Sequence, residues 1–299
     1  MRVLITGGSG QLGRALRAVY AGAHEVYAPG RDGLDLADAG RVHRAVAVAA
    51  PDLIVHAGAA TDVDGCEARV EEAFLVNAFG ARLLALEAAA RDIPLVYVST
   101  NYVFDGAKPP GQAYHEWDRT GPLSVYGRSK LGGEEEVRAL APRHFIVRTA
   151  WLYAAEGRNF VHTMLRLADA ATGPLRGVAD QWGQPTYAAD LAVGIAALTR
   201  AGVYGTYHLT NAGACTWHEW ARELFRLAGR EVAIEPIPGA AFRRAATPPA
   251  NGVLANWAAA ALGVTLPDWR DGLRRCLAEM GRLGGRTQRR TQDSGLRTQ

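Results

Sequence analysis

Cysteine, lysine and long apolar runs are scarce in this chain of 299 residues. The three cysteines, Cys66, Cys215 and Cys276, lie far apart and form no Cys-x-x-Cys pair, which argues against a disulfide framework and a zinc site. No uncharged apolar run reaches about 18 residues, so no transmembrane helix is expected. The N-terminus leads directly into a strand pattern, without the features of a signal peptide. Together these absences predict a cytoplasmic protein that does not contact the membrane.

The positive charge of the chain is concentrated at its C-terminal end. Five arginines and one aspartate give residues 281–299 a net charge of +4, which leaves −1 for the first 280 residues of a chain whose total is +3. A nucleic-acid partner would need basic side chains on a folded face, so none is expected. Among the 33 basic residues only Lys108 and Lys130 are lysines, so a lysine-containing motif has few chances to arise by accident.

Over the first 150 residues, short apolar runs alternate with helical patterns, as in a parallel α/β sheet. Strands are expected at 3–5, 25–28, 53–56, 95–99 and 145–147, and a long helix at 67–91. Asp38 is expected to cap a helix that Pro51 closes. Right-handed crossovers would arrange these elements as a doubly wound, Rossmann-like sheet, which binds ligands beyond the carboxyl ends of its strands.

The second half of the chain has a looser pattern, richer in Pro and Trp. A capping box at 216–219 begins one helix that ends near Gly229, and another is expected around 269–280. We therefore expect residues 1–150 to form mainly a dinucleotide-binding domain. Residues 151–280 would form mainly a smaller, substrate-binding lobe at the carboxyl edge of the sheet. Residues 281–299 repeat Arg-Thr-Gln three times and are expected to be disordered.

A glycine-rich segment follows the first strand and opens the first helix, with Gly7, Gly10 and Gly13 three residues apart. Such a turn lets the diphosphate of a dinucleotide approach bare backbone N–H groups. A glycine-rich turn without a ligand is the alternative, but the position between strand and helix favours the dinucleotide. The second strand ends at Arg31 without an acidic residue before Asp32, which favours NADPH, although Asp32 could still bind the ribose of NADH.

Tyr126 and Lys130 are four residues apart, so on a helix they share one face. A cation near a phenol favours the phenolate and brings its pKa closer to neutral pH, which suits an acid–base catalyst. The alternative, a solvent-exposed Tyr/Lys pair, is less favoured because the chain has only two lysines. A hydroxyl that donates to a substrate carbonyl is expected at the end of the fourth strand. Thr100 is the first choice there and Ser99 the second.

These residues together resemble the extended short-chain dehydrogenase/reductases and, within them, the branch of dTDP-4-dehydrorhamnose reductases. The similarity covers nearly all of residues 1–280. Its clearest stretches are 7–13, 34–36, 51–57, 99–106, 122–131, 148–154, 180–186 and 266–269. The resemblance implies hydride transfer from NADPH or NADH to the C4 keto group of a dTDP-linked 4-keto-6-deoxyhexose. The expected product is dTDP-L-rhamnose.

The resemblance also implies roles for individual residues. Thr100, Tyr126 and Lys130 would be catalytic, and Thr100, Asn101 and Trp151 would contact the sugar nucleotide. The cofactor would be held by Gly7, Gly10, Gln11, Leu12, Gly13, Arg31, Asp35, Leu36, Ala59, Ala60, Thr61, Tyr126 and Lys130. Some relatives form homodimers through a magnesium ion held by acidic residues. The matching place in the first helix is Ala15, so a homodimer without a metal is compatible with the sequence.

The sequence departs from the family pattern around the expected sugar site. Asn101 stands where an aspartate is usual, Gly252 where a serine is usual, and Pro248–Pro249 where an Arg-Pro pair is usual. These changes concern the identity of the sugar more than the chemistry. Two alternatives remain at this point. One is an epimerase or dehydratase on the same scaffold, and the other is a non-catalytic subunit related to the regulatory subunit of methionine adenosyltransferase.

Overall fold

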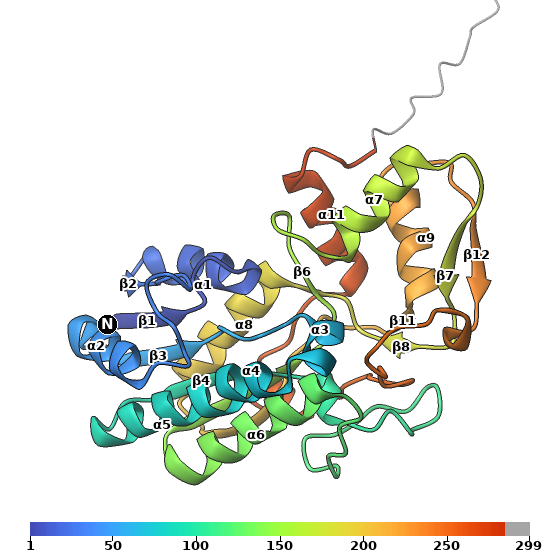
Figure 1. Cartoon of the computed structure of the whole chain (residues 1–299). Coiled ribbons are helices and arrows are strands. Elements are labelled where there is room, and N and C mark those ends of the chain that lie inside the picture. The colour runs from blue at the N-terminus through green and yellow to red at the C-terminus, as the bar shows by residue number, and fades with distance from the viewer. Residues whose placement is uncertain (285–299) are drawn as a thin grey trace, which may run out of the picture.

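A six-stranded parallel sheet forms the centre of the computed structural model, which describes residues 1–284 (Figure 1). The strand order is β2-β1-β3-β4-β5-β10, and every neighbouring pair is parallel. The bounds are β1 Arg2–Thr6, β2 Glu25–Tyr27, β3 Leu53–His56, β4 Leu95–Thr100, β5 His144–Thr149 and β10 Gly205–His208. The predicted doubly wound sheet and its five strands are confirmed. The direction of the strand order reverses between β1 and β3, the usual position of a ligand cleft.

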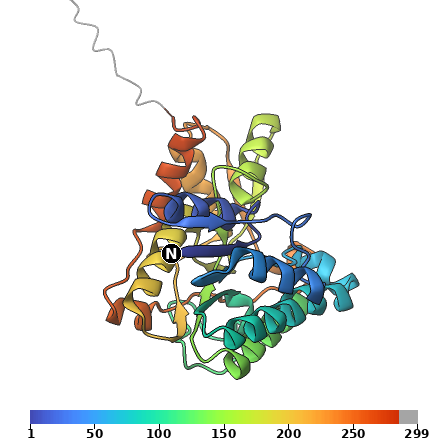
Figure 2. The ribbon, with the colours of Figure 1, turned by 90° about the vertical axis from the view of Figure 1, so that its left-hand side faces the viewer.

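Helices cover both faces of the sheet (Figure 2). On one face α1 (Gln11–Ala21) packs against α8 (Ala188–Ala201) over a core that includes Ile5, Leu16 and Leu191. The other face carries α2 (Ala39–Ala49), α5 (Gly80–Ala90) and α6 (Val125–Leu140), over a core that includes Leu4 and Leu84. Because both faces are covered, the strands are apolar runs rather than alternating ones.

The capping residues set where the helices begin. Asp38 accepts from the Arg41 backbone N–H (3.0 Å) at α2, as expected. Ser124 accepts from the Gly127 N–H (3.1 Å) and is the N-cap of α6, which begins at Val125, the residue before Tyr126. The capping box predicted at Thr216 is present at α9 (Trp217–Leu227). These caps satisfy N–H groups that a helix leaves unpaired at its first turn.

The helix predicted at 67–91 is divided into several parts, so this expectation was wrong in detail. It comprises the end of α3 (Val63–Ala68), then α4 (Val70–Phe74), the π-helical turn η1 (Leu75–Phe79) and α5. The break lies at Arg69, whose φ of −122° is not helical. Within residues 1–284, Val70–Ala90 is the one stretch with the length and apolar composition of a membrane span, and 39% of its most apolar window is buried in the protein. In the fold, η1 and α5 pack against α6.

A smaller lobe stands at the carboxyl edge of the sheet (Figure 1). It contains α7 (Phe160–Ala170), α9 and α11 (Trp269–Glu279), packed around Trp220 and Leu273. Its short strand pairs are β7–β12 (Leu175–Val178, Ile234–Ile237), β8–β11 (Trp182–Gly183, Cys215–Thr216) and β6–β9 (Leu152–Tyr153, Thr186–Tyr187). Three further short helices are η2 (Asn101–Val103), η3 (Gly239–Ala241) and α10 (Trp257–Ala261).

The chain crosses between the two parts more than once. Within 151–280, the range expected mainly in the smaller lobe, α8 and β10 pack in the sheet domain, because their apolar residues complete one face of the sheet. After α11, the Gly284 N–H donates to the Leu227 carbonyl (2.9 Å). Most of the tail expected to be disordered, residues 285–299, lies outside the described residues.

Candidate active site

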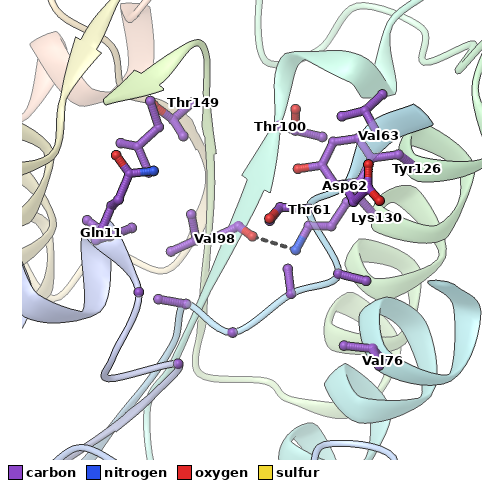
Figure 3. Close-up of a pocket in the computed structure, with 18 of the residues that line it drawn as sticks. Gln11, Thr61, Asp62, Val63, Val76, Val98, Thr100, Tyr126, Lys130 and Thr149 are labelled. Carbon is purple, nitrogen blue, oxygen red and sulfur yellow. Dashed lines mark hydrogen bonds between the residues drawn. The ribbon is translucent and has the colours of Figure 1, made fainter. Parts of the chain in front are cut away.

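A cavity of about 970 Å³ lies at the carboxyl ends of β1, β3 and β4, between the sheet and the smaller lobe. Figure 3 shows Gln11 on one side of it and Thr61, Tyr126 and Lys130 on the other. The structure brings every site residue expected from the sequence to this cavity. They are Gly7, Gly10, Gln11, Leu12, Gly13, Arg31, Asp35, Leu36, Ala59, Ala60, Thr61, Thr100, Asn101, Tyr126, Lys130 and Trp151.

The glycine-rich loop has the backbone that a phosphate group needs. Gly7 has a φ of +68°, and a Cβ there would lie 2.7 Å from the Gly58 Cα, so only glycine fits. The loop ends at Gly10, the N-cap of α1, which has no side-chain cap and no acidic residue in its first turn. A helix presents unpaired N–H groups and partial positive charge at this end. The donor set therefore fits the diphosphate of a dinucleotide.

A loop of the smaller lobe reaches across to this glycine-rich loop. The Asn159 side-chain amide donates to Gln11 Oε1 (2.8 Å) and to the Ala154 carbonyl (2.8 Å). At the edge of the same contact, Arg14 Nε lies 3.2 Å from Glu156 Oε2. These bonds join α1 to the loop between β6 and α7, so the two parts of the molecule meet directly at the expected diphosphate position.

Four charged residues alternate in sign along the end of the cavity where the second strand stops. Arg31 Nη2 lies 3.6 Å from Glu72 Oε1, and Glu72 Oε2 lies 3.1 Å from Arg69 Nε. Arg69 Nη2 in turn bonds Asp62 Oδ2 at 2.9 Å. All four line the cavity, and we call them the charged row. Glu72, Arg69 and Asp62 were not predicted from the sequence. They lie within one short segment, and only the fold brings that segment to Arg31.

Asp35 and Leu36 form the neighbouring part of the wall. The Asp35 carboxylate accepts from the Ala37 N–H (3.0 Å), which fixes a turn after Asp35. Leu36 is buried against Gly58 and Gly80 while it lines the cavity. Leu36 therefore gives the cavity an apolar wall beside the charged row. Asp32, the alternative ribose ligand, is not among the cavity-lining residues of the described chain.

Asn77, which the sequence analysis did not select, holds the central loop of the site. It lies in the π-helical turn η1 and is fully buried. Its Oδ1 accepts from the Ala60 N–H (2.8 Å), and its Nδ2 donates to the Ala60 carbonyl (3.1 Å) and to Ser129 Oγ (2.9 Å). The Ser129 hydroxyl donates to the Tyr126 carbonyl (2.9 Å). Asn77 therefore connects the loop after β3 with the helix that carries Tyr126 and Lys130.

Lys130 is buried on α6 and faces the floor of the cavity. Its Nζ donates to the Val98 carbonyl at 2.7 Å (Figure 3). The same atom lies 4.0 Å from the centroid of the Tyr97 ring. Burial lowers the pKa of Lys130 to about 7, and the charge of Glu134 opposes that effect. The ammonium is thus held in a place where its proton is easily lost.

Tyr126 and Thr100 meet at the end of β4. Burial raises the pKa of the Tyr126 phenol, and the hydrogen bond with Thr100 partly lowers it. The expected lowering of this pKa by Lys130 is not found, because the Lys130 ammonium turns to the Val98 carbonyl instead. Tyr126 is consequently a neutral phenol that holds its proton at neutral pH.

Ser99, the second choice for the hydroxyl donor, is engaged elsewhere. Its hydroxyl donates to Glu134 Oε1 (2.6 Å), and the same carboxylate accepts two bonds from Arg148, at 2.8 and 2.7 Å. All three residues are buried. The carboxylate and guanidinium satisfy each other, so this group supports β4, β5 and α6 from behind the site.

Two of the departures from the family pattern touch each other. The Asn101 side-chain amide donates to the Gly252 carbonyl (3.0 Å), and its Oδ1 lies 3.4 Å from the Thr100 hydroxyl. A Cβ at residue 252 would overlap Asn101 Nδ2. The amide at 101 donates a bond that a carboxylate could not, and the glycine at 252 leaves room for that amide. The 151 positions between them hide this relation in the sequence.

Aromatic side chains form the wall on the side of the smaller lobe. Trp151 adopts a φ of +42°, unusual for a residue other than glycine. Its ring stacks on Trp217 with the centroids 3.7 Å apart. Trp217, Trp220 and Phe160 also line the cavity, as does Arg244, whose Nε bonds Asp64 Oδ1 at 3.1 Å. The sequence predicted only Trp151 of this set. Across residues 1–284 no group of three or more His, Cys, Asp or Glu side chains could hold a metal ion.

Comparison with known proteins gives consistent matches over almost the whole chain. The profile of the family described as "RmlD substrate binding domain" matches residues 1–282. A dTDP-4-dehydrorhamnose reductase of Sinorhizobium fredii is 41% identical over 287 residues, which cover 92% of this chain and 96% of the relative. A probable dTDP-4,6-dihydroxy-2-methyloxan-3-one 4-ketoreductase of Streptomyces antibioticus is 43% identical, with coverages of 94% and 96%.

The solved structures agree. The crystal structure of dTDP-4-dehydrorhamnose reductase from Bacillus anthracis in complex with NADP has a TM-score of 0.89 and 38% identity, and the alignment covers 93% of this chain and 99% of the other. A dTDP-4-dehydrorhamnose reductase from Clostridium acetobutylicum has a TM-score of 0.90 and 36% identity, with coverages of 94% and 100%.

Proposed function

The chain belongs to the family described as RmlD substrate binding domain, and from this premise we propose how its residues carry out the reaction. The protein is an NADPH-dependent reductase that acts on the C4 keto group of a dTDP-linked 4-keto-6-deoxyhexose. We propose dTDP-4-dehydro-L-rhamnose as the sugar and dTDP-L-rhamnose as the product, with NADH as an alternative reductant.

The residues of the sheet domain would hold the cofactor along the cavity. Gly10, Gln11 and Leu12 at the start of α1 would hold its diphosphate, Gln11 and Leu12 through their backbone N–H groups, while the Gly10 N–H closes the turn onto the Gly7 carbonyl (2.9 Å). The adenine would lie against Leu36 and Asp35, and the 2′-phosphate near Arg31. When bound, NADPH supplies the hydride for the reaction.

The residues at the end of β4 and the start of α6 would act on the sugar. Thr100 would donate a hydrogen bond to the C4 carbonyl oxygen, which polarises the carbonyl bond. Tyr126 would give its proton to this oxygen as negative charge develops there. Lys130 would bind the nicotinamide ribose with its ammonium, which lies against the Val98 carbonyl and not against the phenol. Trp151 and Asn101 would orient the sugar.

One observation carries this proposal. The neutral phenol of Tyr126 shares a cavity with the unpaired N–H groups of α1, and the Thr100 hydroxyl contacts the phenol. A reductase needs a protonated acid in this place. A phenol is protonated at neutral pH even at its ordinary pKa of about 10, and burial raises the pKa of Tyr126 further.

The direct test is to mix the purified protein with dTDP-4-keto-6-deoxy-L-lyxo-hexulose and NADPH, follow the loss of reduced cofactor, and identify the sugar formed. We expect one dTDP-L-rhamnose for each NADPH oxidised. Conversion of the sugar without net oxidation would indicate an epimerase or dehydratase. Complete absence of turnover, together with co-purification with a synthetase, would indicate a regulatory subunit.

Replacing Tyr126 by phenylalanine tests the proposed proton donor. The Y126F variant should lose about 100-fold or more in kcat, the range expected for a general acid. The Kd for NADPH should stay within about twofold, because the ring still fills its place. Steady-state kinetics and a binding titration measure the two quantities. A Y126F variant that retains most of its turnover would refute the assignment.

We also propose that the enzyme works in the cytoplasm, where reduced nicotinamide cofactors and nucleotide-linked sugars are formed. A homodimer is proposed on the premise of family membership alone. The molar mass of the full chain in solution, against 32.0 kDa for one chain, tests it.

A further inference from the structure

The charged row of Arg31, Glu72, Arg69 and Asp62 contains an acidic residue, Glu72, in a position where a phosphate site does not require one. Glu72 lies between two arginines, 3.6 Å from Arg31 and 3.1 Å from Arg69. It also lines the cavity. The proposed placement of the cofactor puts the adenosine ribose beside Arg31, so Glu72 would lie close to the 2′-position of that ribose.

NADPH and NADH differ only at this position. NADPH carries a 2′-phosphate with a charge of about −2 at neutral pH, and NADH carries a hydroxyl. A carboxylate that neutralises Arg31 therefore weakens NADPH binding by its own repulsion and by engaging the arginine. Its Coulombic effect on a neutral 2′-hydroxyl is small, and the Glu72 carboxylate is already engaged by two arginines.

We propose that Glu72 sets the preference of this enzyme between NADPH and NADH, by holding Arg31 away from the 2′-phosphate that only NADPH carries. The inference rests on the proposed placement of the adenosine ribose beside Arg31. It makes Glu72 a specificity-determining residue for the adenosine end of the cofactor.

Both side chains are accessible to solvent, so Glu72 competes with the 2′-phosphate for Arg31 and does not block the phosphate position. The side chain of Arg31 is 81% exposed and that of Glu72 is 44% exposed. Exposed ion pairs of this kind contribute little to stability, so a phosphate dianion can displace the carboxylate. Arg69 is bonded to Asp62 at 2.9 Å, a contact that does not involve Arg31.

The test compares two neighbouring glutamates of α4. Glu72→Gln removes the charge that touches Arg31, whereas Glu71→Gln removes an equal charge from an exposed residue of the same turn that does not line the cavity. The Kd values of NADPH and NADH are measured by calorimetry on the full chain without sugar, so the result does not depend on turnover.

For E72Q we expect the Kd of NADPH to fall about three- to tenfold, the size of one charge acting on a dianion within a few ångströms in salt-containing water. The Kd of NADH should change less than about twofold, and E71Q should change neither cofactor by more than that. The selective gain of E72Q should disappear in about 1 M salt, where the screening length is ~3 Å.

Three results would overturn the inference. They are an equal gain for both cofactors in E72Q, the same gain in E71Q, and no gain at all. A further variant locates the effect: combining Arg31→Gln with E72Q should reduce the gain, because the part that acts through Arg31 is lost and only the relief of direct repulsion remains. If R31Q alone leaves the Kd of NADPH unchanged, the placement of the ribose is wrong. If R31Q weakens NADPH while E72Q is silent, only the role of Glu72 is wrong.

Discussion

At the scale of single residues, the site consists of groups whose ordinary chemistry is changed by burial. Tyr126 keeps its proton because burial disfavours the phenolate, and Lys130 loses its proton easily because burial disfavours the ammonium. In the proposed reaction Tyr126 would start as a phenol that holds its proton, and Lys130 as an ammonium that loses its proton easily. Burying the Lys130 ammonium lowers the free energy of unfolding of the protein.

The stability term of Lys130 gives a prediction with a definite sign. The pKa of Lys130 is about 7 in the folded protein against 10.5 as its reference value. The penalty for burying the ammonium is full below pH 7 and fades as pH rises towards 10.5. A K130M variant should therefore melt higher than the natural protein at pH 6, by about 3 °C for each ~1 kcal/mol of relief. This gap should shrink at pH 9.

Thermal unfolding followed by circular dichroism at the two pH values measures the gap, and turnover provides the control. K130M should lose most of its activity at both pH values, since Met cannot bind the ribose. A difference in Tm that widens as the pH rises would contradict the expected sign.

At the scale of elements, the π-helical turn η1 decides how the site is assembled. It lengthens one turn of the helix between α4 and α5, and this places Asn77 against Ala60 on one side and Ser129 on the other. A regular α-helix would carry this side chain in another direction. Such π-helical insertions are frequent at functional sites.

Replacing Asn77 by alanine should affect both stability and cofactor binding. The Ala60 N–H and carbonyl would lose their partners in a partly buried loop. We expect a loss of about 2–4 kcal/mol in the free energy of unfolding, and a higher KM for NADPH because the loop at 59–61 is released. Urea denaturation and steady-state kinetics measure these effects. Ser129→Ala, which removes only one bond of Asn77, should have the smaller effect on both. An unchanged KM in N77A would show that Asn77 only supports the fold.

At the scale of the whole molecule, the cavity exists because two layers of the fold meet at one edge of the sheet. The reversal of strand order between β1 and β3 opens a crevice, and the smaller lobe covers it with Trp151, Trp217 and the loop before α7. The bond between Asn159 and Gln11 joins the two sides at the glycine-rich loop. We therefore expect cofactor binding at the glycine-rich loop to be coupled to the position of the smaller lobe.

A Q11A variant tests this connection. Without the Gln11 amide, the loop at 154–159 loses its hydrogen bonds to Gln11 and keeps the Arg14–Glu156 ion pair with α1. We expect the KM values for NADPH and for the sugar nucleotide to rise together, by about three- to tenfold if roughly 1 kcal/mol is lost. Glu156→Gln, which breaks only an ion pair whose carboxylate side chain is 74% exposed, should change either KM by less than about twofold. A rise for NADPH alone would mean that Gln11 serves the cofactor without holding the lobe.

The amino-acid sequence determined the parts of this protein that depend on local patterns. The apolar runs gave five strands of the sheet, the glycine spacing after β1 gave the phosphate loop, and the spacing of Tyr126 and Lys130 gave one helical face. Short-range geometry is enough for these, because a helix or a tight turn is fixed by residues a few positions apart.

Only the tertiary structure decided which distant residues complete the site. Asn77, Glu72 and Trp217 lie on segments whose meeting depends on packing, and Asn101 and Gly252 are separated by 151 positions. The direction of the Lys130 ammonium was also decided there, by a buried carbonyl on a neighbouring strand. A group buried in a folded protein must find a hydrogen-bond partner, and which partner lies in reach is a property of the fold.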